Sequence, residues 1–382
     1  MPSLATTPSL SLTADFSLED FRQFMIKAAQ EYRASDIYIQ TESRLGLRIE
    51  GQCLACSDRP LRASEVEQIL VYTFQSETAP TQLRSGEILD YAWELRVDRS
   101  TRLRFRVNGT ATWSPSGLGG CDLTFRILPR TTPSMEDVGL PLSILPYCTP
   151  KTGIVMVSGA TGQGKSTTMA ALLGHYLQHE GGRIVDVQSP IEFTFRDIAH
   201  DLPHLALSEV PHDLPDFASA VWASLRRSPD VISIGETRDM ATVKALISAS
   251  LTGHLVYTTI HAGNIVEIMR RIVALTSGDQ SVTADLPIVL RLLVSQRLLP
   301  GTDGRRKVVR EYLSLDDRVR LQLWNTTPDT WPRVINDILW EPPPGILTRP
   351  FVEDCRSLLE DNEITERTAR HFLQSAGGLD RL

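Results

Sequence analysis

The sequence predicts an α/β protein with two folded domains, and three features support this prediction. Strand-like and helix-like segments mix over the first 128 residues. From about Lys151 the pattern becomes a repeat of strand, loop and helix, which is typical of a parallel sheet with helices on both faces. A glycine-rich segment, Gly-Ala-Thr-Gly-Gln-Gly-Lys-Ser (159–166), joins the first strand of this repeat to its first helix.

The bulk composition agrees with a globular chain. Its 382 residues are enough for two or three cores, and 42% of them are hydrophobic. The net charge of −7 argues against a long basic track, so nucleic acid is not expected as a direct ligand. No apolar run approaches the roughly 18–20 residues that span a bilayer. Residues 1–15 lack basic residues and an apolar block, which predicts a disordered start and no signal peptide.

The first domain is predicted over residues 16–128. It starts with an amphipathic helix at 16–31, on which Phe21, Phe24, Met25 and Ala28 share one face. A second helix is expected at 62–72. Alternating apolar and polar residues predict strands at 35–40, 45–50, 91–97, 102–108 and 121–127. Four prolines between residues 129 and 146 predict a linker, taken as 129–150.

The second domain is predicted as an α/β core over 151–315, followed by a helical C-terminal region over 316–382. Each predicted strand is a short apolar run, and the helices between them start at capping residues such as Asp239 and end at glycines such as Gly253. The strands are expected at 154–157, 183–187, 231–234 and 255–260. Helices are expected at 167–178, 213–227, 239–253, 264–275, 283–293, 351–359 and 365–375.

The glycine-rich segment matches the phosphate-binding pattern G-x-x-x-x-G-K-[ST], and its strand and helix context is the one this pattern requires. Glycines let the backbone approach phosphates closely, while amides at the helix N-terminus point at the anion. We therefore expect the chain to bind ATP with Mg²⁺. Lys165 is expected to reach the β- and γ-phosphates, and the Ser166 hydroxyl to hold the metal. The expected binding residues are Gly159, Ala160, Thr161, Gly162, Gln163, Gly164, Lys165, Ser166 and Thr167.

Two acidic residues are candidates for the chemistry of hydrolysis. Glu236 follows the apolar strand 231–234, where an acid at the strand tip can orient or deprotonate the attacking water. Gly235 stands where many such enzymes have a metal-holding aspartate. Another carboxylate, or water alone, must then complete the metal shell. Glu192 is the candidate, since it follows the strand 183–187; a solvated surface acid is the alternative interpretation.

Histidines and arginines supply further candidates. His261 and His254 lie at opposite ends of the strand 255–260, and we favour His261 as a group that polarises the γ-phosphate. Arginines contact phosphates across subunit boundaries in many ATPases, although a row of them along a strand is usually a solvated face. The candidates are Arg102, Arg104, Arg106, Arg126, Arg226, Arg227 and Arg238. Cys53 and Cys56 form a lone Cys-x-x-Cys, and all five cysteines are expected to be free thiols.

Four segments resemble, in order, the nucleotide-site motifs of the secretion and type IV pilus ATPases, the family of PilT and GspE. Residues 159–167 are similar to the Walker A motif. Residues 188–193, Gln-Ser-Pro-Ile-Glu-Phe, resemble the Asp box, and 225–239 the Walker B motif. Residues 252–261 resemble the His box. Ser189 and the segment 208–218 are similar to the branch of type IVB secretion and IncI-type plasmid transfer ATPases that contains DotB and TraJ.

The resemblance implies a PAS-like N-terminal domain, a RecA-like P-loop ATPase domain and a homo-hexameric ring. It implies a catalytic base at Glu236, Glu192 near the metal or the attacking water, and His261 near the γ-phosphate. It also implies that the N-terminal arginines Arg104, Arg106 and Arg126 reach the nucleotide. Gln188 and Ser189 replace two acids of the Asp box, so its metal role falls to Glu192 alone.

The expected function is therefore a cytoplasmic ATPase motor, peripheral at the inner face of the inner membrane, that powers conjugation-type secretion or a thin pilus. Inner-membrane secretion or pilus assembly proteins are the implied partners. A pilus-retraction motor is the nearest alternative. A nucleotide-gated scaffold that hydrolyses little is a second, because the Asp box is altered and the Walker B aspartate is missing. A DNA translocase is a third alternative, but the acidic charge balance argues against it.

Overall fold

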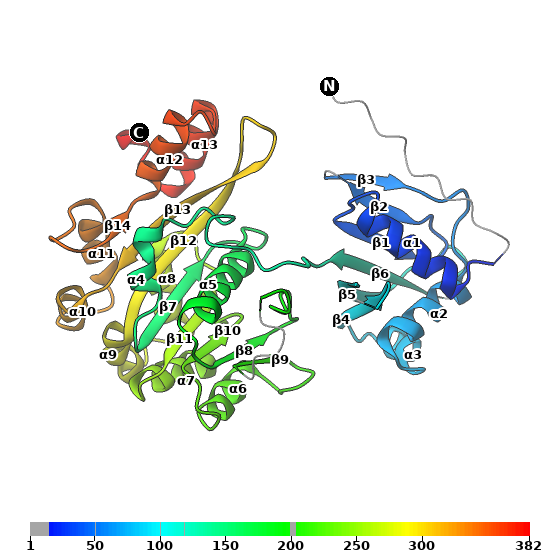
Figure 1. Cartoon of the computed structure of the whole chain (residues 1–382), viewed down its shortest axis with the longest axis horizontal. Helices are drawn as coiled ribbons and strands as arrows, with labels where there is room; N and C mark the ends of the chain where they lie inside the picture. Colours follow the sequence, from blue (N-terminus) through cyan, green and yellow to red (C-terminus); the bar gives the residue numbers. More distant parts are fainter. Residues whose placement is uncertain (1–14, 50, 100, 118, 199–203) are drawn as a thin grey trace. The chain divides into compact units, whose positions relative to one another are not determined.

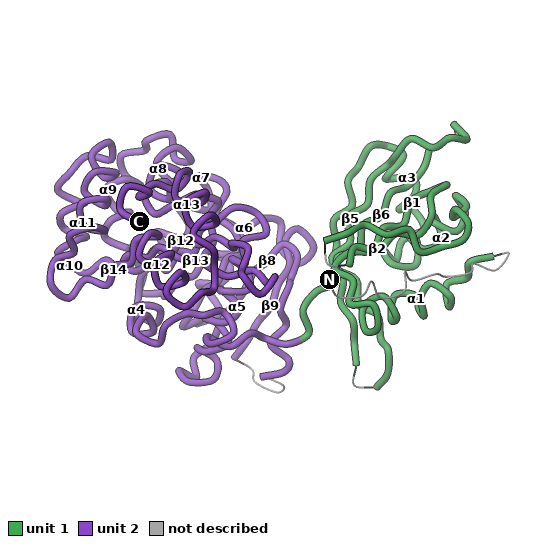
Figure 2. The backbone as a smooth tube through the Cα atoms, turned by 90° about the horizontal axis from the view of Figure 1, so that it is seen from above, with its two compact units in different colours: residues 1–130 green, residues 131–382 purple. Residues whose placement is uncertain are grey.

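The computed structural model describes residues 15–49, 51–99, 101–117, 119–198 and 204–382. The chain divides into two compact units, an N-terminal unit, Met1–Arg130, and a larger unit, Thr131–Leu382 (Figure 2). Of the start expected to be disordered, residues 1–14 lie outside the described residues. The boundary between the units falls inside the proline-rich segment, after Arg130.

Among its described residues, the N-terminal unit forms a six-stranded antiparallel sheet in the order β3-β2-β1-β6-β5-β4 (Figure 1). Ser17 caps the first helix through a reciprocal hydrogen-bond pair with Asp20. The sequence predicted five of the strands and two of the helices, and it missed β3 and α3. The elements are α1 (Leu18–Gln30), β1 (Asp36–Gln40), β2 (Gly46–Ile49), β3 (Gln52–Ala55), α2 (Ala63–Phe74), α3 (Ala79–Arg84), β4 (Leu89–Arg96), β5 (Arg102–Thr112) and β6 (Gly120–Ile127).

Aromatic rings form the centre of the N-terminal core. Trp93 of β4 stacks on Phe21 of α1, with ring centroids 5.5 Å apart, and on Phe105 of β5, at 5.2 Å. Phe125 of β6 packs edge-on against Trp93 at 5.9 Å. Such offset and edge-to-face pairs are the geometries that aromatic quadrupoles favour. Trp93 therefore joins the helix layer to three strands of the sheet.

The larger unit contains, among the described residues, an eight-stranded sheet in the order β14-β13-β12-β7-β11-β10-β8-β9. Six neighbouring strands from β12 to β9 are parallel, and β13 and β14 extend the sheet as antiparallel strands at one edge. The strands are β7 (Gly153–Ser158), β8 (Ile184–Gln188), β9 (Leu205–Glu209), β10 (Val231–Ile234), β11 (Leu255–Ile260), β12 (Leu290–Pro300), β13 (Arg306–Ser314) and β14 (Thr348–Arg349).

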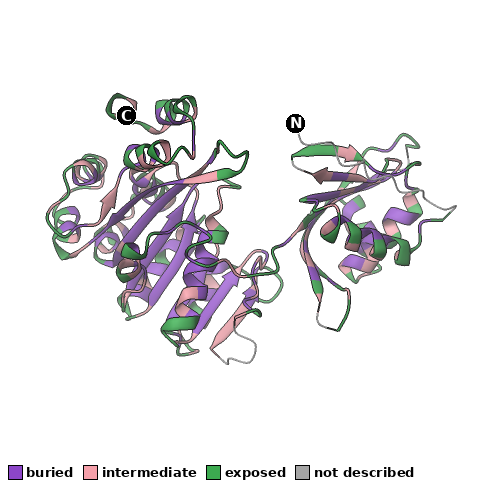
Figure 3. Cartoon of the chain, turned by 45° about the horizontal axis from the view of Figure 1, so that its top comes forward, coloured by how far each residue is buried: buried purple, intermediate pink, exposed green. Residues whose placement is uncertain are grey.

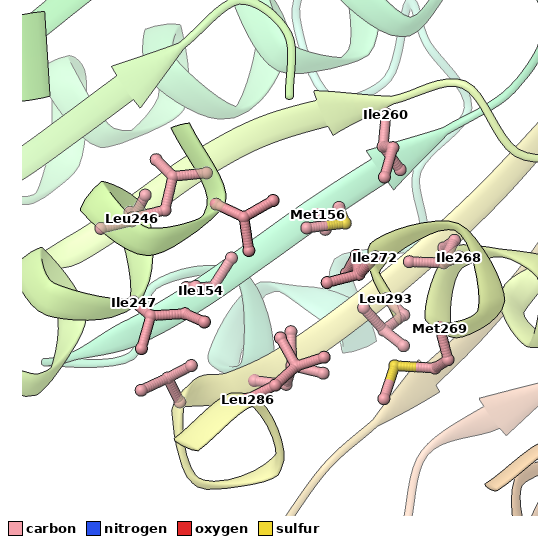
Figure 4. Close-up of a cluster of buried hydrophobic side chains, with 14 of the residues drawn as sticks. Ile154, Met156, Leu246, Ile247, Ile260, Ile268, Met269, Ile272, Leu286 and Leu293 are labelled. Carbon is pink, nitrogen blue, oxygen red and sulfur yellow. The ribbon is translucent and has the colours of Figure 1, made fainter. Parts of the chain in front are cut away.

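Helices cover both faces of this sheet, as the sequence predicted. Val155 and Val157 of β7 face α4 and α5, while Ile154 and Met156 face the layer that runs from α6 to α11 (Figure 4). The central strands are therefore buried on both sides (Figure 3). The helices are α4 (Leu145–Cys148), α5 (Lys165–His179), α6 (Phe217–Ser224), α7 (Met240–Leu251), α8 (Ile265–Leu275), α9 (Gln280–Val289), α10 (Asp317–Trp324), α11 (Trp331–Trp340), α12 (Phe351–Glu360) and α13 (Glu366–Ala376).

The structure corrects the sequence prediction at several elements. The helix predicted at 283–293 is wrong in its last part, because α9 ends at Val289 and Leu290 starts β12. An unbroken apolar run fits a buried helix and a buried strand equally well, and pairing with β7 decides for the strand here. The sequence also missed β9, β13, β14, α10 and α11. The two predicted C-terminal helices are confirmed as α12 and α13.

Residues 131–150 of the segment expected to be a linker belong to the larger unit. Met135, Ile144 and Cys148 are buried there, and the Tyr257 hydroxyl of β11 donates to the Cys148 carbonyl oxygen at 2.6 Å.

All five cysteines are free. Cys53 is exposed, whereas burial raises the pKa of the Cys56 thiol to about 12. Among the described residues, no group of three or more His, Cys, Asp or Glu side chains could hold a metal ion.

Replacing Trp93 with alanine should remove the central ring of the N-terminal core. We expect the free energy of unfolding of this unit to fall by about 3–5 kcal/mol, the usual effect of a large-to-small change at a buried aromatic residue. Urea unfolding of the full chain, followed by circular dichroism, measures the change. The control is Trp113→Ala in the same unit, where the side chain is 77% exposed. Equal effects of the two substitutions would contradict this description of the core.

Candidate nucleotide-binding site

The phosphate loop, residues 159–164, leaves the carboxyl end of the buried central strand β7 and leads directly into α5. Gly164, which caps α5, has a φ of 78°, a left-handed conformation that favours glycine. At Gly159, a Cβ atom would lie 2.8 Å from the backbone oxygen of Gln296 on the neighbouring β12. Both glycines are therefore required by the backbone path itself.

Lys165 lies in the curve of this loop. Its ammonium group donates to the backbone oxygens of Gly159, at 3.0 Å, and Ala160, at 3.1 Å, and lies 3.4 Å from Nδ1 of His261. Burial lowers the pKa of Lys165, and Arg297 lowers it further. The carboxylates of Glu236 and Glu192 act in the opposite direction. Because the ammonium is partly desolvated, it gains more from an anionic ligand than an exposed lysine would.

The first turn of α5 presents exposed polar groups beside Lys165. Ser166 and Thr167 are exposed, as are Ala160, Thr161 and Gly162 in the loop. The Ser166 hydroxyl makes no hydrogen bond in the part of the chain that the structure describes. The first amides of a helix have no partner within the helix, and they combine with its dipole to favour a negative charge. The loop and helix start therefore offer the donors that a polyphosphate needs.

Glu236 and His261 come together from neighbouring parallel strands. Glu236 follows β10 and His261 follows β11, and Nε2 of the histidine lies 3.1 Å from Oε1 of the glutamate. Both side chains are partly exposed, at 30% and 38%. The other nitrogen of the same imidazole faces Lys165. Glu236, His261 and Lys165 thus form one continuous polar group at the carboxyl edge of the sheet.

The glycine before Glu236 has a steric reason. A Cβ atom at Gly235 would lie 3.3 Å from the backbone oxygen of Val187 and from Cα of Gln188, so a side chain there would press on β8. The Gly235 amide instead donates to the Val187 oxygen at 2.8 Å, and the Thr259 hydroxyl donates to the Gly235 oxygen at 2.6 Å. A side chain at this position would require β8 to give way by a few tenths of an ångström.

Glu192 is held by a short chain of hydrogen bonds that the sequence analysis missed. Asp186 of β8 is fully buried, and its Oδ2 accepts from the Gln188 side-chain amide at 2.5 Å. The Gln188 oxygen accepts from the backbone amide of Glu192 at 3.1 Å. Burial raises the pKa of Asp186 to about 6, although hydrogen bonds from Ser233 and Gln188 oppose this change. The available signal in the sequence was Asp186, an acidic residue inside an otherwise apolar strand.

Strand β12 anchors the phosphate loop from the side. The Gln296 side chain is buried; its amide donates to the Gln163 backbone oxygen at 2.6 Å, and its oxygen accepts from the Thr168 hydroxyl at 2.8 Å. In return, the Gln163 side-chain oxygen accepts from the Leu298 amide at 2.6 Å. The sequence analysis did not place residues 296–298 at the site, because their strand was not predicted.

His254 lies away from this group. It precedes β11, at the opposite end of the strand from His261, and its Nδ1 lies 3.1 Å from the Ala249 oxygen at the end of α7. His254 therefore has a structural role at a helix terminus, and His261 is the histidine that the structure brings to the loop.

Arg238, one of the candidate arginines, packs its guanidinium over the Phe217 ring at 5.1 Å.

Arg104, Arg106 and Arg126 lie in the N-terminal unit on one face of its sheet, opposite the buried Phe105 and Phe125. Arg106 pairs in register with Arg126 across β5 and β6. Arg106 forms an ion pair with Asp90 at 2.7 Å, and Arg126 with Asp36 at 2.9 Å. The three side chains thus lie on one face of the sheet, and those of Arg106 and Arg126 pair with acids of different neighbouring strands.

Comparison with known proteins gives consistent results. A family model for type II/IV secretion system proteins matches residues 12–326. The type IV pilus ATPase PilU of Pseudomonas aeruginosa is 28% identical over 292 residues, which are 76% of this chain and 73% of PilU. The X-ray structure of the ATPase DotB of Legionella pneumophila superimposes with a TM-score of 0.81 and 32% identity, covering 96% of this chain and 99% of DotB.

The pilus retraction motor PilT, solved with bound ADP, gives a TM-score of 0.78 at 27% identity and covers 94% of this chain and 98% of PilT. These matches confirm the predicted fold class, an N-terminal α/β domain followed by a RecA-like ATPase domain with a parallel-rich sheet. No helix among the described residues is both long and apolar enough to cross a membrane. The chain belongs to the type II/IV secretion system protein family, whose members include the secretion and type IV pilus ATPases, and it lies close to DotB within that family.

Proposed function

We propose that this chain binds ATP at the phosphate loop and hydrolyses it to ADP and phosphate. The observation that supports this most directly is the group formed by Lys165, His261 and Glu236, with separations of 3.4 Å and 3.1 Å between the interacting atoms. These groups meet where the strand ends of a RecA-like sheet bind their ligands. A cation for the phosphates and a carboxylate for the water are the two parts that phosphoryl transfer needs.

Each residue has a defined role in this proposal. The amides of 159–167 surround the phosphates and Lys165 neutralises the β- and γ-phosphates. Glu236 orients the attacking water and accepts its proton as the new bond to the γ-phosphorus forms and ADP leaves. His261 bridges Lys165 and Glu236 and so lies beside the transferred phosphoryl group.

The exposed Ser166 hydroxyl and the Glu192 carboxylate fit a Mg²⁺ ion, which prefers oxygen ligands and keeps several waters. When bound, this ion neutralises charge on the β- and γ-phosphates. The shortage of protein carboxylates around it agrees with a metal held mainly by the nucleotide and water. Asp186 and Gln188 contribute by fixing the backbone at Glu192.

At the level of the cell, we propose a homo-hexameric motor that powers type IVB secretion or conjugative transfer from the inner face of the inner membrane. In this ring, Arg104, Arg106 and Arg126 would contact the nucleotide, and Arg106 and Arg126 would exchange Asp90 and Asp36 for phosphate. The likeness to the DotB of Legionella pneumophila, at 32% identity against 27% for PilT, supports the secretion role. A pilus-retraction motor remains the second candidate, which the ADP-bound PilT structure favours.

Replacing Glu236 with glutamine should separate binding from turnover. The amide keeps the size of the side chain but cannot accept the proton, so we expect turnover to fall by about 10²- to 10⁴-fold with ATP affinity nearly unchanged. Phosphate release and equilibrium binding of a fluorescent ATP analogue measure the two quantities. The control is Glu360→Gln, an exposed acid on α12 in the same unit. Unchanged turnover in Glu236→Gln would remove this residue from the role of base.

Replacing Asp186 with alanine should weaken the support of Glu192. We expect the Mg²⁺ concentration for half-maximal hydrolysis to rise by about tenfold, the size of effect that groups supporting a metal ligand usually have. Asp186→Asn keeps an acceptor for the Gln188 amide and should give a smaller rise. A magnesium titration of hydrolysis at fixed ATP measures both variants. A loss of activity with the same magnesium dependence would indicate a purely structural role for Asp186.

Replacing the genomic copy with a Lys165→Ala version tests the cellular role. We expect transfer of a mobile element to recipients to be lost both in liquid and on a surface, because the secretion channel itself would lack its motor. Colony counts of recipients give the result. Loss in liquid alone would point to a thin pilus. Normal transfer with altered surface motility would contradict the secretion role and support the retraction motor.

A further inference from the structure

Arg297 is a half-buried cation for which the proposed function has no role. It lies on β12 directly after Gln296, the residue that anchors the phosphate loop. Its guanidinium donates to the Gln296 backbone oxygen at 3.1 Å, and it forms no ion pair in the part of the chain that the structure describes. A guanidinium has five donors, so most of its hydrogen-bonding capacity is unused in this arrangement.

Two loops of the site converge on this guanidinium. One terminal nitrogen lies 3.5 Å from the position that a Cβ atom on Gly159 would occupy, at the start of the phosphate loop. The other lies 3.3 Å from the corresponding position on Gly263, two residues after His261. Side chains larger than hydrogen at these positions would crowd the arginine. Arg297 therefore lies between the phosphate loop and the segment that follows His261.

The electrostatics around Arg297 favour an anion. Burial lowers the pKa of its guanidinium. The carboxylate of Glu267 opposes this change, and that carboxylate already accepts from the Gly263 amide at 2.6 Å. Arg297 also lowers the pKa of Lys165, so the two cations repel each other across the loop. The carboxylates of Glu236, Glu192 and Glu267 offset part of this repulsion, and a negative ligand that binds both cations would offset more of it.

We propose that Arg297 is a phosphate-binding residue that contacts the γ-phosphate of ATP bound in its own subunit. This inference rests on the proposed function, since it assumes that the loop binds ATP. The location of Arg297 beside the His261 segment assigns it to the γ-phosphate, while the loop amides and Lys165 also hold the β-phosphate. Its contact distinguishes ATP from ADP and stabilises the charge on the transferred group, as an arginine finger does.

A second ligand for Arg297 is less well supported. The residue also lines a cavity of about 940 Å³ between β12 and α13, together with Arg367, Arg370 and His371. Arg367, Arg370 and His371 are exposed, and Arg370 already pairs with Glu366 at 2.8 Å. Such exposed cations are balanced by water and salt. The unpaired, half-buried guanidinium points instead to the phosphate loop.

The test compares the affinity of the purified full chain for a non-hydrolysable triphosphate, AMP-PNP, with its affinity for ADP. Arg297→Gln should weaken AMP-PNP binding by about tenfold or more, the effect of losing a charged hydrogen bond, while ADP binding changes by less than about threefold. Arg297→Lys keeps the charge without the planar fork, so its AMP-PNP affinity should lie between those of the native chain and Arg297→Gln. It also serves as the test if the glutamine variant does not fold.

Arg291→Gln is the matched control. Arg291 lies on the same strand, has a pKa that burial also lowers, and donates to backbone oxygens at the opposite end of β12. We expect this variant to bind both nucleotides like the native chain. An equal loss of AMP-PNP and ADP affinity in Arg297→Gln, or no loss of either, would overturn the inference. A native chain that binds neither nucleotide would instead overturn the proposed function, and the inference with it.

Discussion

The site depends on the hydrogen bonds that the buried side-chain amide of Gln296 makes. It ties the phosphate loop and α5 to β12, through Gln163 at 2.6 Å and Thr168 at 2.8 Å. A glycine-rich loop has high conformational freedom and loses much entropy on ordering. These hydrogen bonds hold it in one shape before a ligand arrives, so less binding energy is spent on ordering it. Phosphate binding is thus prepared by a neighbouring strand as well as by the loop itself.

The same edge of the sheet connects the loop to distant parts of the larger unit. Arg310 of β13 is buried, and its guanidinium donates to the Val138 and Gly139 backbone oxygens at 2.6 Å and 3.0 Å. Its backbone amide donates to Asp354 of α12 at 2.8 Å. These hydrogen bonds therefore tie the segment that enters this unit and the C-terminal helix α12 to strand β13 of the core sheet.

The sequence predicted the parts of the site that local patterns encode. Strand, glycine loop and helix gave Lys165 and Ser166, and apolar strands ending in polar residues gave Glu236 and His261. What escaped prediction depends on tertiary packing. The pairing of β12 with β7 is not visible in an apolar run, so Gln296 and Arg297 were not placed beside the loop. The link from Asp186 to Glu192 through Gln188 also requires knowledge of which side chains face each other.

We propose that this prepared loop is where the chain binds and hydrolyses ATP. The decisive experiment measures phosphate release by the purified full chain over a range of ATP concentrations in the presence of Mg²⁺, beside the Lys165→Ala variant. We expect saturable release by the native chain and background release by the variant, because the loop would lose its only ammonium group. Equal release by both proteins, or background release by the native chain at every ATP concentration, would contradict it.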